Sequence, residues 1–245
     1  MRTKPRPLLC ELHAHTRWSD GVLSIRELVD LHGRNGFDVL AITDHVVRRD
    51  DPWRTRPGIV VRAVDERTWV SYLAEIERES QRALATYGLV VVPGLELTFN
   101  DEEAVKAAHA VALGLRQFAS VDAGIAGAIE TAVQAGAAVV AAHPYGRDEP
   151  AGGNLRVTQR FSRDAGLRGL VHRFELFNRS HLFGWVADAG LPAVAAGDFH
   201  TTDHLAGWRT LIPCERSVEA VVEYLRSPRP VYLTRFDAEI ARVAA

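Results

Sequence analysis

The sequence predicts a single α/β domain built on a mostly parallel β-sheet or barrel. Short apolar runs rich in β-branched residues alternate with segments of helical periodicity along the whole chain of 245 residues. Neither an internal repeat nor a low-complexity linker divides it, and this length suffices to bury one large core. The apolar content of 47% and charged content of 24% are those of a globular protein and exclude disordered and collagen-like classes. We therefore expect one domain over residues 1–245.

Nine short segments are expected to be strands, because each is apolar and bounded by turn residues. They are, in order, Leu8–His13, Val39–Thr43, Leu89–Glu96, Ala110–Leu115, Ala137–Ala142, Arg173–Phe177, Ala193–Ala196, Arg209–Ile212 and Val231–Thr234. Their alternation with helical segments favours parallel pairing, since parallel strands need a long crossover connection.

Six segments have the apolar spacing of amphipathic helices. They are Ile25–Asn35, Thr68–Tyr87, Val121–Ala135, Val157–Ala165, Phe183–Ala189 and Val218–Arg226. Asp20 and Ser24 are candidate caps for the first of them. Glycines at positions 36, 88, 136 and 190 stand where four helices should end.

The segment Val46–Arg67 fits neither pattern. It is rich in Arg and Asp, contains Pro52 and Pro57, and follows the end of an expected strand. A connection this long inside a compact domain is usually functional. We expect it to form a wall of the substrate pocket, where Trp53 could stack on a ring such as a base.

Charge and cysteine content narrow the class of protein. The formal net charge is −2, which excludes a protein that holds nucleic acid chiefly by bulk positive charge but permits a local basic pocket for one phosphate. Two cysteines provide neither a disulfide framework nor a thiolate metal site. No stretch is apolar for long enough to serve as a signal peptide or a membrane span, so a soluble, cytoplasmic protein is expected.

Six of the ten histidines and three carboxylates lie at or beside the ends of expected strands. Ligand sites gather at the carboxyl ends of strands in both barrels and open sheets. Imidazole and carboxylate without thiolate suit Zn²⁺, Mn²⁺ or Fe. Nine ligands exceed what one ion accepts, so we expect two or three divalent ions bridged by a carboxylate. The residues are His13, His15, Asp20, His45, Glu96, His109, His143, Asp198 and His200.

His109 opens its apolar run, whereas the other candidate ligands follow theirs. The connection Asn100–Ala108 is too short for a usual parallel crossover. An antiparallel return strand would begin where the previous strand ends and would bring His109 beside Glu96.

The ordered motifs H-x-H, S-D-G, T-D-H, P-G-x-E, H, A-H-P and D-x-H resemble those of the polymerase and histidinol phosphatase (PHP) superfamily of metal-dependent phosphoesterases, over Leu9–His200. The resemblance implies a distorted (βα)7 TIM-like barrel and hydrolysis of phosphate esters by metal-activated water. It implies one metal held by His13, His15, Glu96 and Asp198, a second by Glu96, His109 and His143, and a third by Asp20, His45 and His200. Many members have His where Asp20 stands, which leaves the identity of the third metal open.

Three further residues are expected to have supporting or structural roles and not to bind metal. Asp44 faces away from the side that His45 occupies and is expected to support a ligand. Glu11, where the family usually has Asp, either supports a ligand or accepts a buried backbone amide. His32, near a helix carboxyl end, is expected to be a favourable charge there.

The candidate substrate-binding residues follow strand ends near these motifs. Arg17, Arg147 and Arg179 could each hold a phosphate with two hydrogen bonds. His181 and His204 lie just past strand ends. The expected partner is a small phosphorylated metabolite or nucleotide, with nucleic acid possible only as a short nucleotide or a strand end. Monoester or diester preference and oligomeric state stay open.

Two other functions are considered. An amidohydrolase-type C–N hydrolase also begins with H-x-H, but its two-metal members typically use a strand lysine as the bridge, whereas the lysines here are Lys4 in the tail and Lys106 in a loop. A non-catalytic metal module that supports nucleic-acid processing is the other alternative, although such modules tend to lose ligands.

Overall fold

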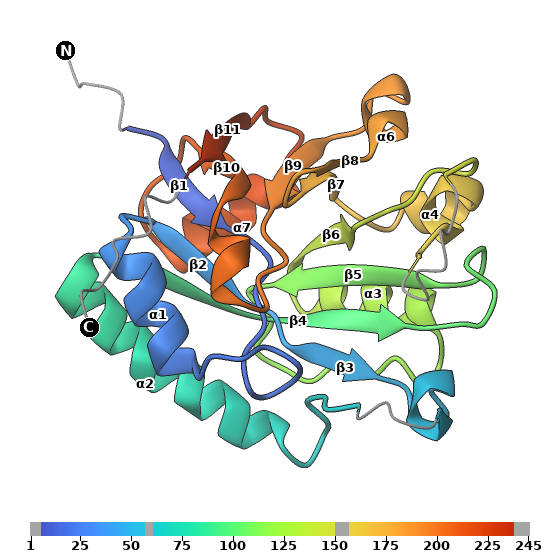
Figure 1. Cartoon of the computed structure of the whole chain (residues 1–245), viewed down its shortest axis with the longest axis horizontal. Coiled ribbons are helices and arrows are strands. Elements are labelled where there is room, and N and C mark those ends of the chain that lie inside the picture. The colour runs from blue at the N-terminus through green and yellow to red at the C-terminus, as the bar shows by residue number, and fades with distance from the viewer. Residues whose placement is uncertain (1–5, 57–60, 150–156, 238–245) are drawn as a thin grey trace.

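The computed structural model describes residues 6–56, 61–149 and 157–237, which form one mixed α/β fold around a single curled sheet (Figure 1). The sheet order is β11-β10-β1-β2-β4-β5-β6-β7-β8, with β3 paired to β4 and β9 paired to β7. The strands are β1 (Leu8–Glu11), β2 (Val39–Ile42), β3 (His45–Val47), β4 (Val90–Phe99), β5 (Ala108–Leu113), β6 (Ala138–Ala142), β7 (Arg173–Asn178), β8 (His181–Leu182), β9 (Ala193–Ala196), β10 (Gly207–Ile212) and β11 (Tyr232–Phe236).

Strand direction is mixed. The pairs β1–β2, β2–β4, β6–β7 and β7–β9 are parallel, whereas β5 is antiparallel to β4 and to β6, and β10 is antiparallel to β1 and β11. The sheet curls far enough that the segment after β9 meets the segment after β1. There the His15 N–H donates to the Phe199 carbonyl at 2.8 Å, and the Phe199 N–H donates to the His13 carbonyl at 3.0 Å. The result is a curled half-barrel.

Helices pack against both faces of the sheet. The helices are α1 (Ile25–Arg34), α2 (Trp69–Tyr87), α3 (Ile125–Gln134), α4 (Arg160–Arg163), α5 (Ala165–Arg168), α6 (Gly184–Asp188) and α7 (Val218–Arg226). A large apolar core joins α1, α2 and α3 to the outer face. A second core fills the concave face with alternate strand residues, such as Val90 and Val92, and with Val221 and Leu225 of α7. Because residues in a strand alternate between faces, Glu96 of β4 follows Val90 and Val92 on the concave face.

Most expected elements are confirmed within one to three residues, including the antiparallel return that carries His109. The strands β3 and β8 were not expected, because each has only two or three residues. The expected helix Val157–Ala165 is wrong: short helices α4 and α5 replace it, with Asp164 capping α5. The four glycines expected at helix ends all have positive φ: 76° at Gly36, 64° at Gly88, 89° at Gly136 and 63° at Gly190.

Ser24 alone caps α1, in a capping box with Glu27. Asp20 lies elsewhere, so its interpretation as a cap was wrong. His32 was also misjudged as a favourable charge. Its side chain is completely buried, and burial lowers its pKa to about 3, so the imidazole is neutral. Within the described residues, no helix is both long enough and apolar enough to cross a membrane.

Candidate metal centre

The nine candidate ligands converge at one end of the curled sheet. His13 and His15 follow β1, and Asp20 lies in the next loop. Further ligands come from β3, β4 and β5 and from the segments after β6 and β9. Three groups of their ligand atoms lie close enough together to hold an ion: His13, His15 and Glu96; Glu96, His109 and His143; and His15, Asp20, His45 and His200. The convergence expected from strand ends is therefore present in the structure.

Glu96 is the centre of this arrangement. Its Oε1 lies 3.0 Å from Nδ1 of His109 and 3.2 Å from Nε2 of His143. Its Oε2 lies 2.7 Å from Nδ1 of His45, 3.4 Å from Nε2 of His13 and 3.5 Å from Nε2 of His15. Each carboxylate oxygen thus faces a different set of imidazoles, and a carboxylate placed in this way can bridge two cations.

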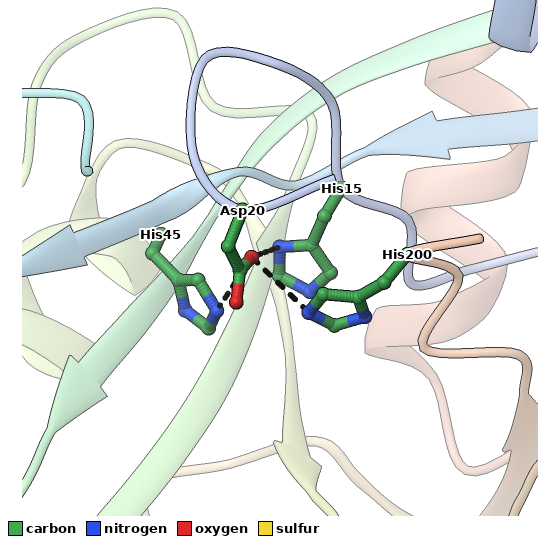
Figure 2. A group of neighbouring side chains, drawn as sticks. All are labelled: His15, Asp20, His45 and His200. Carbon is green, nitrogen blue, oxygen red and sulfur yellow. Dashed lines mark ion pairs between the residues drawn. The ribbon is translucent and has the colours of Figure 1, made fainter. Parts of the chain in front are cut away.

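A second carboxylate organises the other side of the cluster. Oδ1 of Asp20 lies 3.1 Å from Nε2 of His200, 3.4 Å from Nε2 of His45 and 3.9 Å from Nδ1 of His15. Figure 2 shows the three rings arranged around this carboxylate. His15 therefore lies between the two sides of the cluster, a position that the resemblance did not imply.

Asp198 lies between the same two sides. Its Oδ1 is 3.3 Å from Nε2 of His15, 3.6 Å from Nε2 of His13 and 3.4 Å from Nδ1 of His200. Its Oδ2 accepts a hydrogen bond from the Arg179 guanidinium at 3.0 Å. One oxygen is thus fixed by Arg179 while the other faces the imidazoles.

Besides Nε2 of His200, three buried atoms around Glu96 have no hydrogen-bond partner within the described part of the chain: Nε2 of His13, Nε2 of His15 and Oε2 of Glu96. An unsatisfied polar atom in a buried site is costly. All three face the same space, and all three are atoms that bind Zn²⁺, Mn²⁺ or Fe. The donor set therefore fits divalent cations.

The electrostatics of the cluster agree with that fit. Burial would raise the pKa of Glu96, but the imidazoles of His45, His13 and His109 hold it well below its usual range. Burial opposes the charge of His45, yet Glu96 and Asp20 raise its pKa to about 10. Burial, with His200 and His45 nearby, lowers the pKa of His15 to about 3. The carboxylates thus attract positive charge, which divalent cations would also supply.

Supporting contacts hold the imidazoles in place. Thr98 Oγ1 lies 2.7 Å from Nδ1 of His45. Asp44 accepts hydrogen bonds from the backbone and hydroxyl groups of Thr16 and Ser19, which fixes the loop after His15 and agrees with the supporting role expected for Asp44. Such contacts set ring orientation and ligand basicity.

Glu11 accepts buried backbone amides. It accepts from the N–H groups of His13 and Gly197 and pairs with the Arg209 guanidinium, with Nε 2.9 Å from Oε2. A Cβ at Gly197 would lie 2.1 Å from Oε2 of Glu11, so this close approach requires glycine.

Sequence reasoning missed Glu175 of β7. Its side chain is buried, and Oε1 lies 2.8 Å from Nδ1 of His13. A signal was present: a glutamate interrupts the otherwise apolar run Phe174–Phe177, and glutamate is almost never buried without a partner.

Backbone strain is concentrated at the same end of the sheet. His143, Arg179 and Asp198 have φ values of 29°, 54° and 44°. Each follows the end of a neighbouring strand, β6, β7 or β9. Residues other than glycine adopt these values at a cost and concentrate at functional sites.

A cavity of about 500 Å³ opens beside the metal centre. Its walls include six of the nine candidate ligands: Asp20, His45, His109, His143, Asp198 and His200. Arg179 and His181 also line it, as expected of substrate-binding residues. Its remaining walls are Val47, Trp53, Val61, Arg62, Thr98, Asn100, Tyr145, Asn178 and Phe183.

The other candidate substrate-binding residues lie outside these walls. Arg17 is exposed and pairs with Glu27 at 3.2 Å, and Arg147 is exposed. His204 is occupied as an acceptor, because its Nδ1 takes the backbone N–H of His200 at 3.0 Å. The segment Val46–Arg67 contributes Val47, Trp53, Val61 and Arg62 to the cavity, while residues 57–60 lie outside the described residues.

Comparison with known proteins agrees with this geometry. A profile of the PHP domain family matches residues 11–144. The chain is 26% identical over 137 residues to the DNA polymerase/3′-5′ exonuclease PolX of Bacillus subtilis (strain 168); the match covers 56% of this chain and 23% of that protein. The chain thus spans about a quarter of that relative.

Two solved structures resemble the fold. One is a two-domain protein from Bacteroides vulgatus ATCC 8482 containing a predicted PHP-like metal-dependent phosphoesterase, with a TM-score of 0.63 and 18% identity, covering 95% of this chain and 67% of that one. The other is an amidohydrolase from Chromobacterium violaceum with bound sulfate and no metal, with a TM-score of 0.51 and 19% identity, covering 79% of this chain and 88% of that one.

Proposed function

Because the chain belongs to the PHP domain family, we propose that it is a hydrolase that removes or cleaves the phosphate ester of a small phosphorylated molecule. The observation that carries the proposal is Glu96, whose two oxygens face two different sets of imidazoles inside a buried cluster. We further propose that the chain is a single PHP-type domain and that its described residues form one distorted (βα)7 barrel, closed where Phe199 pairs with the segment after β1.

The proposed centre holds two or three divalent ions of Zn, Mn or Fe. One would be held by His13, His15, Glu96 and Asp198, a second by Glu96, His109 and His143, and a third by Asp20, His45 and His200. Bound there, the ions would lower the pKa of a bound water, which could then act as the nucleophile. Their positive charge would stabilise the phosphoryl oxygens.

The chain's own residues would bind and orient the ester. The Arg179 guanidinium is fixed by the Gly197 carbonyl at 3.3 Å and by Asp198, and it lines the cavity. A guanidinium held in place in this way can bind a phosphoryl oxygen with little loss of side-chain freedom. His181 lies on the same wall, where its ring contacts Tyr145 with a centroid separation of 5.3 Å.

The cavity is much larger than a phosphate group and can accommodate a small organic molecule. Trp53 contributes to one wall, and Arg56 lies 4.2 Å from its ring centroid. Phe183 and Tyr145, whose rings contact each other, also line the cavity. We propose that Val46–Arg67 contacts the alcohol part of the substrate, with Trp53 stacking on a flat ring.

The first experiment measures metal content and hydrolysis together. The purified protein is stripped with a chelator and reloaded separately with Zn²⁺, Mn²⁺ or Fe²⁺. Release of phosphate or alcohol is then followed from an aryl phosphate and from its diester. We expect hydrolysis to return with at least one metal; a fully loaded protein that cleaves neither ester would contradict the proposal.

A second experiment tests the ring. Benzyl phosphate and cyclohexylmethyl phosphate both release primary alcohols and differ mainly in the flatness of the ring. We expect Trp53→Leu to raise KM for benzyl phosphate about fivefold, the range of one aromatic pair, and to change KM for the saturated ester less. The control is Tyr232→Leu, which removes an aromatic ring 58% exposed on β11, away from the cavity. Equal effects on both esters would exclude Val46–Arg67 from ring recognition.

The end of a nucleic-acid strand is a second candidate substrate, favoured by the similarity to PolX. A short 5′- or 3′-labelled oligonucleotide, assayed beside the mononucleotide, separates the two. The amidohydrolase alternative is less well supported, because a glutamate stands where a bridging lysine would be, and Lys106 is exposed and paired with Glu103.

A further inference from the structure

Glu175 is a buried carboxylate that none of the three candidate metal groups includes. Its Oε1 lies 2.8 Å from Nδ1 of His13. Its Oε2 accepts the backbone N–H of His143 at 2.7 Å and the Asn178 side-chain amide at 2.8 Å. The two oxygens of one side chain therefore contact two candidate ligands that come from different strands.

A β-bulge brings Asn178 to the face of the sheet that Glu175 occupies. The pairing of β7 with β9 shifts register between Glu175 and Phe177, so Leu176 is the extra residue. Without a bulge, Glu175 and Asn178 would face opposite sides of the sheet, because residues three apart alternate. With it, they hydrogen-bond to each other at the concave face, while Phe177 stacks on Trp208 with a centroid separation of 4.5 Å. Bulges next to active sites commonly redirect side chains in this way.

We propose that Glu175 is a positioning residue that orients His13 and His143 together and thereby prepares two metal positions at once. The carboxylate oxygen 2.8 Å from Nδ1 of His13 holds the ring so that Nε2 faces Oε2 of Glu96 at 3.4 Å. The other oxygen takes the N–H of His143, whose φ of 29° is unfavourable and needs support.

The role of Glu175 differs from that of Thr98. Thr98 contacts only one imidazole of the cluster through its hydroxyl, that of His45 on the Asp20 side. Glu175 serves His13 and His143, which belong to the two groups that share Glu96. Loss of Glu175 should therefore weaken two metal positions, whereas loss of the Thr98 hydroxyl should weaken one.

The experiment counts metal ions without substrate. Wild-type protein, Glu175→Ala and Thr98→Val are dialysed against buffered Zn²⁺ and titrated with a competing chelator. We expect Glu175→Ala to lose affinity at two positions by about 10- to 100-fold each, and Thr98→Val to lose affinity at one. The visible spectrum after loading with Co²⁺ should change in both variants, because it reports the geometry around the ion.

Glu175→Gln keeps the protein testable if the alanine variant does not fold. A carboxamide accepts hydrogen bonds at its oxygen but not at its nitrogen. Either His13 or His143 therefore loses its acceptor, whichever way the group turns. We expect a folded protein with one position weakened about tenfold. Rescue of affinity by Glu175→Asp would support orientation by a carboxylate.

Wild-type affinity at every position in Glu175→Ala, or in a folded Glu175→Gln, would overturn the inference. Weakening of a single position in Glu175→Ala would also overturn it. The inference rests on the proposed function only for the metal centre, so the two can fail separately. If the Glu175 variants lose metal affinity as expected but the wild-type protein hydrolyses no ester, only the proposed function would be contradicted.

Discussion

Charged side chains are buried at both ends of the concave face of the sheet, but the two ends differ in how these side chains are satisfied. At the amino end of β7, the buried Arg173 donates to the carbonyls of Leu225 at 3.0 Å, Ser227 at 2.7 Å and Arg229 at 2.6 Å, around the carboxyl end of α7. The guanidinium thus supplies donors to carbonyls that a helix leaves unpaired, and its charge faces the negative end of the helix dipole.

At the carboxyl ends of the strands, Glu96 is equally buried, but Oε2 and the neighbouring imidazole nitrogens lack hydrogen-bond partners within the described residues. Buried polar groups in folded proteins are almost always satisfied. The Arg173 end is complete as it stands and is therefore structural. The Glu96 end is complete only with cations, and this difference identifies it as the candidate site.

The largest effect should come from Glu96→Ala, which removes the carboxylate that we propose as the bridge. We expect activity to fall at least about a thousandfold, the upper range for loss of one charge-stabilising group, and at least one metal per chain to be lost. Hydrolysis rates and elemental analysis on the same sample measure both. Full metal content in this variant would remove the distinction between the two ends.

Arg173→Met tests the other end. The carbonyls at the end of α7 would lose their donors, so we expect the free energy of unfolding to fall by about 3 kcal/mol. Urea unfolding measures this change. Metal content and kcat should stay within twofold of wild type. A loss of metal at unchanged stability would show that the Arg173 end also belongs to the site.

His32 sharpens the comparison, because its Nε2 also lacks a hydrogen-bond partner among the described residues but lies between the apolar rings of Phe37 and Phe199. Its folded pKa of about 3 is below the unfolded value near 6.5, so the unfolded chain binds the proton first. The free energy of unfolding should therefore fall as pH drops from 6.5 to 4.5, by about 2 kcal/mol from this residue.

The measurement is the difference between wild type and His32→Gln in urea unfolding across that pH range. The wild type should lose more stability on acidification, because glutamine does not titrate. Parallel curves would mean that the pKa of His32 is the same in the folded and unfolded states, which would contradict the lowered folded value. A single unsatisfied atom then changes stability without forming a site, whereas several that converge form one.

Asp20→His should have the smallest effect. The Asp20 side of the cluster already contains His15, His45 and His200, so another imidazole keeps the ligand count while making the set softer. We expect hydrolysis to stay within about tenfold and the preferred metal to change. Activity ranked over Mn²⁺, Fe²⁺ and Zn²⁺ tests this, and an unchanged ranking would argue against Asp20 as a ligand.

The sequence predicted the convergence of the site because strand ends and residue chemistry are local properties. His109 was placed beside Glu96 correctly, since the connection of Asn100–Ala108 was too short for a parallel crossover. The contacts of Glu175 could not be predicted, because His13 is 162 positions distant and the hydrogen bond with Asn178 depends on a bulge one residue away.

Long-range packing also decides which arginine side chains line the cavity. Arg179 and Arg147 follow strand ends in similar ways, yet only the first faces the cavity. The path of the backbone after each strand makes the difference, and Arg179 turns inward through a φ of 54°. Residue type and spacing do not encode such turns.

The spread of the ligands from His13 to His200 has a consequence for how the protein acquires its ions. Asp198 and His200 emerge from the ribosome long after the first pair of histidines, and Glu96 and Glu175 emerge between them. A nascent chain can present only fragments of the site, so the apolar cores must bring the ligands together before an ion binds tightly. If the proposed centre binds metal, loading would therefore follow folding, and we expect the ions found in the purified protein to follow the growth medium.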